Sequence, residues 1–302
     1  MTKNSIALYL SIIGFLLLSA VGWYAFSLLS QPRTDAVSFD GQRAYTDVQT
    51  QVAFGSRVTG TEGNVKVEEW MREELVKSGW QVEVQESETM GHLIRNVVAK
   101  RSDETPQIII GAHYDTRMFA DHDPDPAQHT TYVPGANDGA SGVAVLLELA
   151  RSLPKETTPI WLVFFDAEDN GDINGWDWIL GSREFVKNNT FQPQAVVVVD
   201  MIGDADLNIY RERNSNPGLT NEIWEAARSL GYQNKFISAY KYSMLDDHTP
   251  FLQAGIPAVD IIDFDYPYWH TTQDTPDKVS GESLQIVGET LRVCAIQRSR
   301  QP

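Results

Sequence analysis

Cysteine is almost absent from this sequence: the 302 residues contain only Cys294. A single cysteine excludes a disulfide within the chain and any metal site built from several thiolates. A metal bound by this chain must therefore be held by histidine, aspartate and glutamate side chains.

Positive charge is also scarce. The chain has 24 lysines and arginines against 41 aspartates and glutamates, which gives a formal net charge of −17. Such a surface repels phosphate backbones, so we expect no nucleic-acid partner and no adhesion of the acidic domain to anionic lipid. The sequence has no internal repeat and no low-complexity segment.

Charge is missing altogether from residues 6–29. About 20 apolar residues suffice to cross a bilayer, so this stretch predicts a transmembrane helix. A cleaved signal peptide is the alternative, but its apolar region usually has about 7–15 residues and ends at a small-residue cleavage site. We favour a retained anchor over residues 1–30. Only Lys3 and the terminal amine precede the span, which favours a cytoplasmic N-terminus and an extracytoplasmic catalytic domain over residues 31–302.

Two patterns of apolar residues alternate along residues 31–302. Segments with apolar residues at helical spacing alternate with short apolar runs rich in β-branched residues. This alternation predicts an α/β domain with a mainly parallel, mixed sheet covered by helices on both faces. The expected helices cover residues 62–78, 138–153, 218–231 and 280–298, the last capped by Ser280, and the expected strands cover 95–100, 107–115, 159–169, 195–204 and 255–265.

Ionisable residues follow almost every predicted strand. Because ligand sites in such sheets lie beyond the carboxyl ends of the strands, these side chains are expected at one edge. They are His113 and Asp115, Glu168 and Asp169, Asp200, Asp263 and Asp265, and His270, with Asp138 at the start of a helix.

Most of these residues also have an ordinary structural interpretation. Asp138 is a good helix N-cap, His113 a hydrogen-bonded core histidine, and Asp200 a turn residue. The adjacent acids Glu168 and Asp169 are harder to explain in this way, because two neighbouring carboxylates repel one another unless a proton or cation is present. Zinc accepts both imidazole nitrogen and carboxylate oxygen, so the set provides ligands for one metal or two.

Seven ordered motifs carry a family resemblance. They are GAHYDTR, PGANDGASGVAVLLELAR, FFDAEDNGD, ILGSREF, VVVDMIGD, DDHTPFLQAGIP and YWHTTQDT. In this order they resemble the zinc peptidase family M28, and within it the glutaminyl cyclase branch in its bacterial, animal-type form. The resemblance spans roughly residues 40–298.

The resemblance implies roles for individual residues. In the cyclases one zinc would be held here by Asp138, Asp169 and His270, with Glu168 as the proton shuttle. In the aminopeptidases of the family Asp138 would bridge two zincs, the second completed by His113 and Asp200. Both extra ligands are present, so counting ligands does not separate the two branches. Asp169 stands where glutamate is common.

Three features favour the cyclase branch. Trp269, directly before the ligand histidine, resembles the indole wall of the cyclases, and Asp246 resembles the acid that joins Glu168 and Asp200 in their hydrogen-bond network. The insertion 118–133 resembles a loop of the bacterial cyclases, and we interpret its acids as a solvated surface rather than a calcium loop, because the usual glycine and glutamate are missing.

A cyclase must exclude water and fold glutamine back on itself, which flat apolar walls such as Trp269, Trp176 and Trp178 achieve. Any of these indoles could instead simply pack. We therefore expect a zinc-dependent glutaminyl-peptide cyclotransferase acting on peptides or proteins with an N-terminal glutamine. The alternative is a zinc aminopeptidase, and a third possibility is a membrane-tethered binding module. Glu168 argues against a binding module, since a binder needs no base beside a metal.

Overall fold

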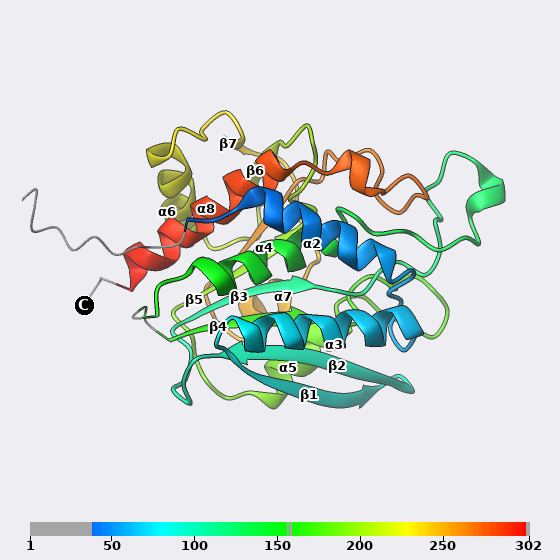
Figure 1. Cartoon of the computed structure of the whole chain (residues 1–302), viewed down its shortest axis with the longest axis horizontal. Helices are drawn as coiled ribbons and strands as arrows, with labels where there is room; N and C mark the ends of the chain where they lie inside the picture. The colour runs from blue at the N-terminus through cyan, green and yellow to red at the C-terminus, as the bar shows by residue number, and fades with distance from the viewer. Residues whose placement is uncertain (1–37, 156, 158, 300–302) are drawn as a thin grey trace, which may run out of the picture. The chain divides into compact units, whose positions relative to one another are not determined.

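The computed structural model describes residues 38–155, 157 and 159–299 (Figure 1). None of the helices in these ranges is long and apolar enough to span a membrane. The span expected over residues 6–29 lies outside the described residues. The anchor and the location of the domain stay predictions, which membrane fractionation of the full-length protein tests.

A six-stranded mixed sheet forms the centre of the domain, in the order β1-β2-β4-β3-β5-β8. Four strands, β4, β3, β5 and β8, run parallel, while β1 and β2 form an antiparallel hairpin that continues the sheet beyond β4. The predicted mainly parallel, mixed sheet is therefore confirmed. The strands are β1 (Gln81–Thr89), β2 (His92–Lys100), β3 (Ile108–His113), β4 (Ile160–Phe165), β5 (Ala195–Asp200) and β8 (Ala258–Ile262).

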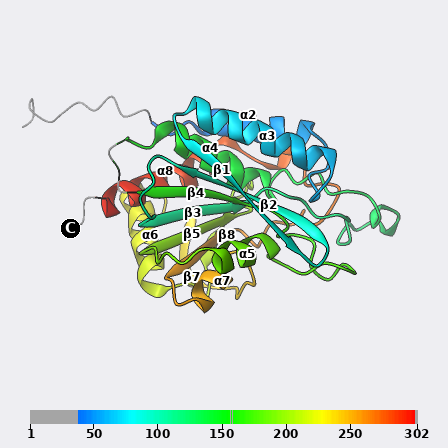
Figure 2. The ribbon, with the colours of Figure 1, turned by 90° about the horizontal axis from the view of Figure 1, so that it is seen from below.

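Helices cover both faces of this sheet, as Figure 2 shows. On one face, apolar side chains of α4 (Ala140–Ser152), α6 (Pro217–Ser229) and α8 (Gly281–Arg298) join one large core with α2 (Gly41–Ala53) and α3 (Glu62–Lys77). On the other face, α5 (Leu180–Asn188) and α7 (Thr249–Gln253) contribute Phe185 and Phe251 to a second core. Strands β3, β4 and β5 are buried on both faces, which explains their nearly continuous apolar sequences.

The sequence patterns located the long elements and missed the short or polar ones. Helix α8 begins after Ser280, whose side chain accepts from the Ser283 N–H as predicted. The patterns did not identify α2, α5, α7, the half-exposed strand β1, or the small sheet formed by β6 (Ile209–Arg211) and β7 (Phe236–Tyr240). Most of these elements are short or largely polar, so tertiary contacts define them. Helix α2 is the exception, because its 13 residues follow the N-cap Asp40 and are amphipathic, so the sequence did carry a signal for it.

Candidate active site

The carboxyl ends of the four parallel strands bring the predicted site residues together. His113 ends β3, Glu168 and Asp169 follow β4, Asp200 ends β5, and His270 lies in the loop after β8. Asp138 lies in the loop before α4. It is not the N-cap of that helix, because Gly139 occupies the cap position without a side-chain bond. The ordinary interpretation of Asp138 as a cap is therefore wrong.

Three buried side chains converge on one point at this edge. His270 Nε2 lies 2.7 Å from Asp169 Oδ1 and 3.7 Å from Asp138 Oδ2. The ligand atoms of these residues all lie within 4.8 Å of one another, and each residue is at most 2% exposed. This is the triad that the cyclase resemblance implied.

A second triad shares Asp138 with the first. His113 Nε2 lies 3.2 Å from Asp138 Oδ1 and 3.1 Å from Asp200 Oδ1. The two oxygens of Asp138 thus face two different histidines. The structure brings together the ligands for a second cation as well, as the aminopeptidase alternative required.

The polar atoms left over at the first triad fit a cation. Asp138 Oδ2 and Asp169 Oδ2 are buried and have no hydrogen-bond partner. A buried carboxylate oxygen without a donor is costly, and a bound cation removes that cost. Two carboxylates and one imidazole are a donor set that zinc accepts, with a fourth position left for substrate or water. The residues therefore fit a zinc ion.

Glu168 lies beside this triad and is held by its backbone. The Glu168 and Asp169 N–H groups donate to the two oxygens of Asp115, at 3.0 and 3.2 Å. Burial raises the pKa of the Glu168 carboxyl well above its usual value, and the nearby charges of Asp169 and Asp246 raise it further, while His113 acts in the opposite direction. A buried carboxyl group beside a metal-ligand triad, with its pKa raised in this way, is suited to act as a general acid–base group.

A cavity of about 160 Å³ opens over these groups. Its polar side is formed by the carboxylates of both triads with Glu168 and Asp246, and its apolar side by two indoles and several large side chains. The lining residues are Asp138, Glu168, Asp169, Trp178, Asp200, Met201, Met244, Leu245, Asp246, Ile262, Phe264 and Trp269. Asp246 is buried, and its Oδ2 has no hydrogen-bond partner.

Two indoles flank the His270 imidazole. The Trp269 ring stacks on it with centroids 3.8 Å apart, and the Trp178 ring lies nearly parallel to it at 6.1 Å. Gly171 allows Trp178 to reach this position, because a Cβ there would lie 2.1 Å from the indole. Both tryptophans are therefore placed as walls of the cavity.

Trp176, the third tryptophan expected in the wall, lies elsewhere. Its ring stacks on His92 with centroids 3.5 Å apart, and it packs against Ile94, Ala167 and Leu180. It does not line the cavity, so its expected place in the wall is corrected. Trp176 and Trp178 lie in the same turn but stack on different rings, His92 and His270. The turn ends at Ile179, which adopts the left-handed conformation with φ of 56°.

Three other expectations at the edge of the sheet are corrected. Asp263 accepts backbone N–H groups of Asn208 and Asp265, and Asp265 pairs with Lys241 on the surface, so neither reaches the cavity. The acids of loop 118–133 are not simply solvated. Asp123 is buried and accepts from the backbone N–H and hydroxyl of Thr272, which ties this loop to the segment after His270.

Backbone strain is concentrated at the site. Ala167, Met201 and His270 all adopt the left-handed conformation, with φ of 54°, 46° and 56°. Such conformations cost roughly 1–3 kcal/mol each for residues other than glycine and persist only where the surroundings impose them. They adjoin or include Glu168, Asp200 and the imidazole, so the turns that aim these side chains are held under strain.

Several residues that support the site were not recognised from the sequence. Asp274 is fully buried and accepts from the backbone N–H groups of Asn137 and Asp138 and from the Tyr266 hydroxyl. Arg117 donates to the backbone oxygen of Asp169. The only available signal was their position inside the motifs that contain the ligands.

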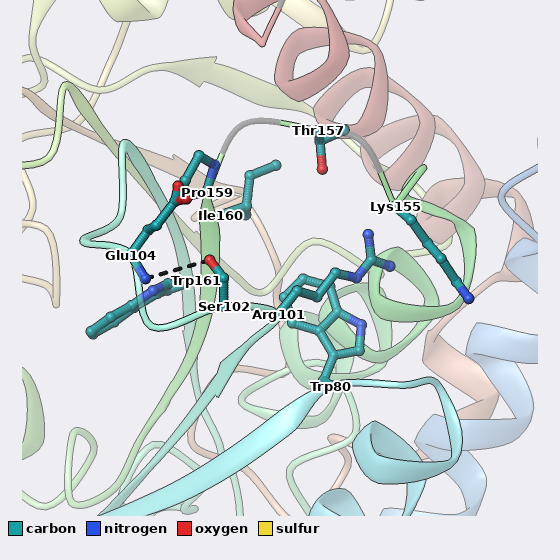
Figure 3. Close-up of a pocket in the computed structure, with 9 residues that line it drawn as sticks. All are labelled: Trp80, Arg101, Ser102, Glu104, Lys155, Thr157, Pro159, Ile160 and Trp161. Carbon is teal, nitrogen blue, oxygen red and sulfur yellow. Dashed lines mark hydrogen bonds between the residues drawn. The ribbon is translucent and has the colours of Figure 1, made fainter.

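A second cavity, of about 210 Å³, lies at the opposite end of β4 (Figure 3). Ile160, the first residue of that strand, lines it, and the Arg101 guanidinium stacks over the Trp80 ring at 4.3 Å. The Arg101 guanidinium also donates to the backbone oxygens of Ala150, Leu153 and Pro154. None of the candidate metal-ligand groups among the described residues includes a residue of this lining.

The buried acids make the stability of the metal-free protein depend on pH. Burial raises the pKa of Asp166, Asp200 and Asp274 to about 7 and that of Asp169 to about 6, whereas in the unfolded chain these groups ionise near pH 4. The folded state therefore keeps protons that the unfolded state releases, and stability should fall as pH rises from about 4 through 7. Thermal unfolding of the metal-free domain at pH 5.5 and 8.0 checks this, and we expect the lower melting temperature at pH 8.0. Zinc should reduce the difference, and an equal melting temperature at both pH values without metal would contradict the prediction.

The fold and the site define a class: α/β proteins with a histidine–carboxylate metal centre at the carboxyl edge of a mainly parallel sheet. Residues 96–295 match the model of peptidase family M28. The chain belongs to this family, and its relatives place it with the glutaminyl cyclases.

Glutaminyl cyclases occur among both the solved structures and the curated relatives that are similar to this chain, together with exopeptidases of the same fold. Porphyromonas gingivalis glutaminyl cyclase is 36% identical, with a TM-score of 0.81 over 86% of this chain and 99% of that one. A Zn-dependent exopeptidase from Parabacteroides distasonis is 32% identical, with a TM-score of 0.82 over 87% of this chain and 100% of that one. The glutaminyl-peptide cyclotransferase of Gloydius blomhoffii is 26% identical, in an alignment that covers 80% of this chain and 77% of that protein.

Proposed function

We propose that this protein is a zinc-dependent glutaminyl-peptide cyclotransferase, which converts N-terminal glutamine of peptides or proteins to pyroglutamate with release of ammonia. The observation that carries the proposal is the pair of indoles, Trp178 and Trp269, beside a buried acid and a metal-ligand triad in one small cavity. The similarity to cyclases from bacteria and snakes supports it.

In this mechanism, the apolar residues of the cavity orient the substrate and Glu168 transfers the proton. The indoles and Phe264 provide apolar walls that fold the glutamine side chain back toward its own amine and keep water out. As the amine nitrogen attacks the side-chain carbonyl carbon, Glu168 takes a proton from it, and it then gives a proton to the departing ammonia. The new carbon–nitrogen bond closes the ring, and the bond to the amide nitrogen breaks.

Asp138, Asp169 and His270 would hold the zinc, which when bound polarises the amide carbonyl. Asp246 and Asp200 line the same cavity, and the charge of Asp246 acts to raise the pKa of Glu168. We assign these two acids to positioning the proton rather than to direct attack.

An aminopeptidase is the second candidate, and the triad of His113, Asp138 and Asp200 favours it. In that case Glu168 would activate water instead of the substrate amine. The similarity to a Zn-dependent exopeptidase supports this second candidate. The two indoles argue for the first candidate, because they leave an apolar cavity where a hydrolase must admit water.

Mass spectrometry of two peptides that differ only in their first residue, glutamine or leucine, separates these functions. With the zinc-loaded protein, we expect the glutamine peptide to lose one ammonia while every peptide bond stays intact, and the leucine peptide to stay unchanged. Release of free leucine with an unchanged glutamine peptide would instead establish the aminopeptidase.

A further inference from the structure

Arg117 lies at the centre of the site without facing the cavity. Its side chain is only 4% exposed, and Nη1 donates to the backbone oxygens of Asp169 and Gly171 at 3.0 and 2.7 Å. The guanidinium also lies over the Trp178 ring, 5.0 Å from its centroid. One buried cation thus contacts both the segment that carries a metal ligand and one wall of the cavity.

The other side of the guanidinium holds loop 118–133. Nε donates to Asp121 Oδ1 at 3.2 Å, and Nη2 donates to Oδ2 at 2.5 Å. This two-point contact fixes the plane of the carboxylate, as arginine–carboxylate pairs with this geometry do. Asp121 is the part of the loop that Arg117 holds directly.

Asp121 in turn faces His270. Its Oδ1 lies 3.7 Å from His270 Nδ1, which is buried and has no hydrogen-bond partner, while Nε2 of the same ring points at Asp169. His122, the residue after Asp121, also holds the two segments together, because its backbone N–H donates to the His270 backbone oxygen at 3.2 Å. The His122 ring also packs edge-on against Trp269, with centroids 4.4 Å apart.

We propose that Asp121, held by Arg117, is a positioning residue that orients His270 and keeps the proton on its Nδ1, so that Nε2 is free to bind the metal. A carboxylate beside the distal nitrogen of a ligand histidine fixes the ring and its tautomer. Arg117 also contacts Trp178, and His122 contacts Trp269, so loop 118–133 touches both indoles. The Asp121–Arg117 ion pair therefore also helps to position the rim of the cavity. The inference rests on the metal assignment in the proposed function and holds for cyclase and aminopeptidase alike.

Asp121 is not a metal ligand itself. Asp121, His122 and His270 do have ligand atoms within 4.8 Å of one another. Both oxygens of Asp121 already accept from Arg117, however, and the guanidinium charge would repel a cation bound there. The Asp121 carboxylate therefore already accepts from Arg117, and its Oδ1 can also accept from an N–H at His270 Nδ1.

The zinc affinity of Asp121 variants tests the inference without any substrate. Asp121→Asn keeps the shape and removes the charge, and Asp121→Ala removes both. Asp125→Ala is the matched control, because Asp125 is an exposed acid of the same loop whose side chain accepts only from the Ala127 N–H. By competition with a chromophoric chelator, we expect zinc binding about 10–100-fold weaker for Asp121→Ala, a smaller loss for Asp121→Asn, and a control within about twofold of the unmodified protein.

The outcomes separate this inference from the metal assignment. Either Asp121 variant with the zinc affinity of Asp125→Ala would overturn the positioning role of Asp121. A failure of the unmodified protein to bind zinc would overturn the metal assignment instead. Thermal unfolding of the metal-free variants accompanies the titrations, and melting temperatures equal to that of the control show that the weaker binding is local to the site.

Discussion

Replacing Glu168 with glutamine is expected to lower the turnover of glutamine-initiated peptides by about 10²–10⁴-fold, the usual contribution of a positioned acid–base group. The amide keeps the shape of the side chain but cannot carry a proton from the attacking amine to the leaving ammonia. Zinc should stay bound, because Glu168 is not part of either ligand triad. Steady-state kinetics together with a zinc determination on the same sample measures both quantities.

Glu184→Gln is the matched control for this variant. Glu184 has the same exposed fraction as Glu168, 8%, but its carboxylate pairs with Lys187 at the end of α5. We expect its turnover to equal that of the unmodified protein. Near-normal turnover of Glu168→Gln with zinc bound would show that another group moves the proton.

Replacing His270 with alanine is expected to weaken zinc binding by more than about 100-fold, because changes to residues that merely support a ligand already cost about 10–100-fold. His270 is the only histidine of the first triad, and the two carboxylates that remain would face one another across a buried space. Zinc should then no longer raise the melting temperature, since a ligand stabilises a protein only in proportion to its binding. Chelator competition and thermal unfolding with and without zinc check the two effects.

His92→Ala provides the control for the loss of an imidazole. His92 stacks on Trp176 outside the cavity, so its removal should leave zinc affinity unchanged. If His270→Ala bound one zinc with unchanged affinity, the first triad would be the wrong assignment, and His113, Asp138 and Asp200 would become the primary site.

Asp138 belongs to both ligand triads, so the two triads are coupled through one side chain. Its two oxygens face His270 and His113, and Asp274 holds its backbone N–H from behind. Both ligand triads are therefore complete in this chain, and two indoles line the same cavity. For the proposed cyclase activity, the cavity walls rather than the ligands would distinguish this site from that of an aminopeptidase.

The sequence by itself determined the class of fold and the chemistry of the site. Strands that are apolar on both faces must be covered on both sides, and the carboxyl ends of parallel strands meet at one edge, so the sequence alone groups the residues that follow them. The near absence of cysteine restricted a metal to histidine and carboxylate ligands. The adjacent acids Glu168 and Asp169 pointed to a cation site, because the repulsion between their carboxylates needs a counter-charge.

Only the tertiary structure decided which side chains reach the cavity. Trp176 and Trp178 are two residues apart and equally plausible as walls, yet one stacks on His92 and the other on the site, because the turn between them directs each toward contacts made elsewhere in the chain. Asp121 and His270 are far apart in sequence and meet only after loop 118–133 is fastened by Arg117 and by Thr272. Contacts of this kind depend on packing between distant segments, for which local periodicity and residue spacing carry no signal.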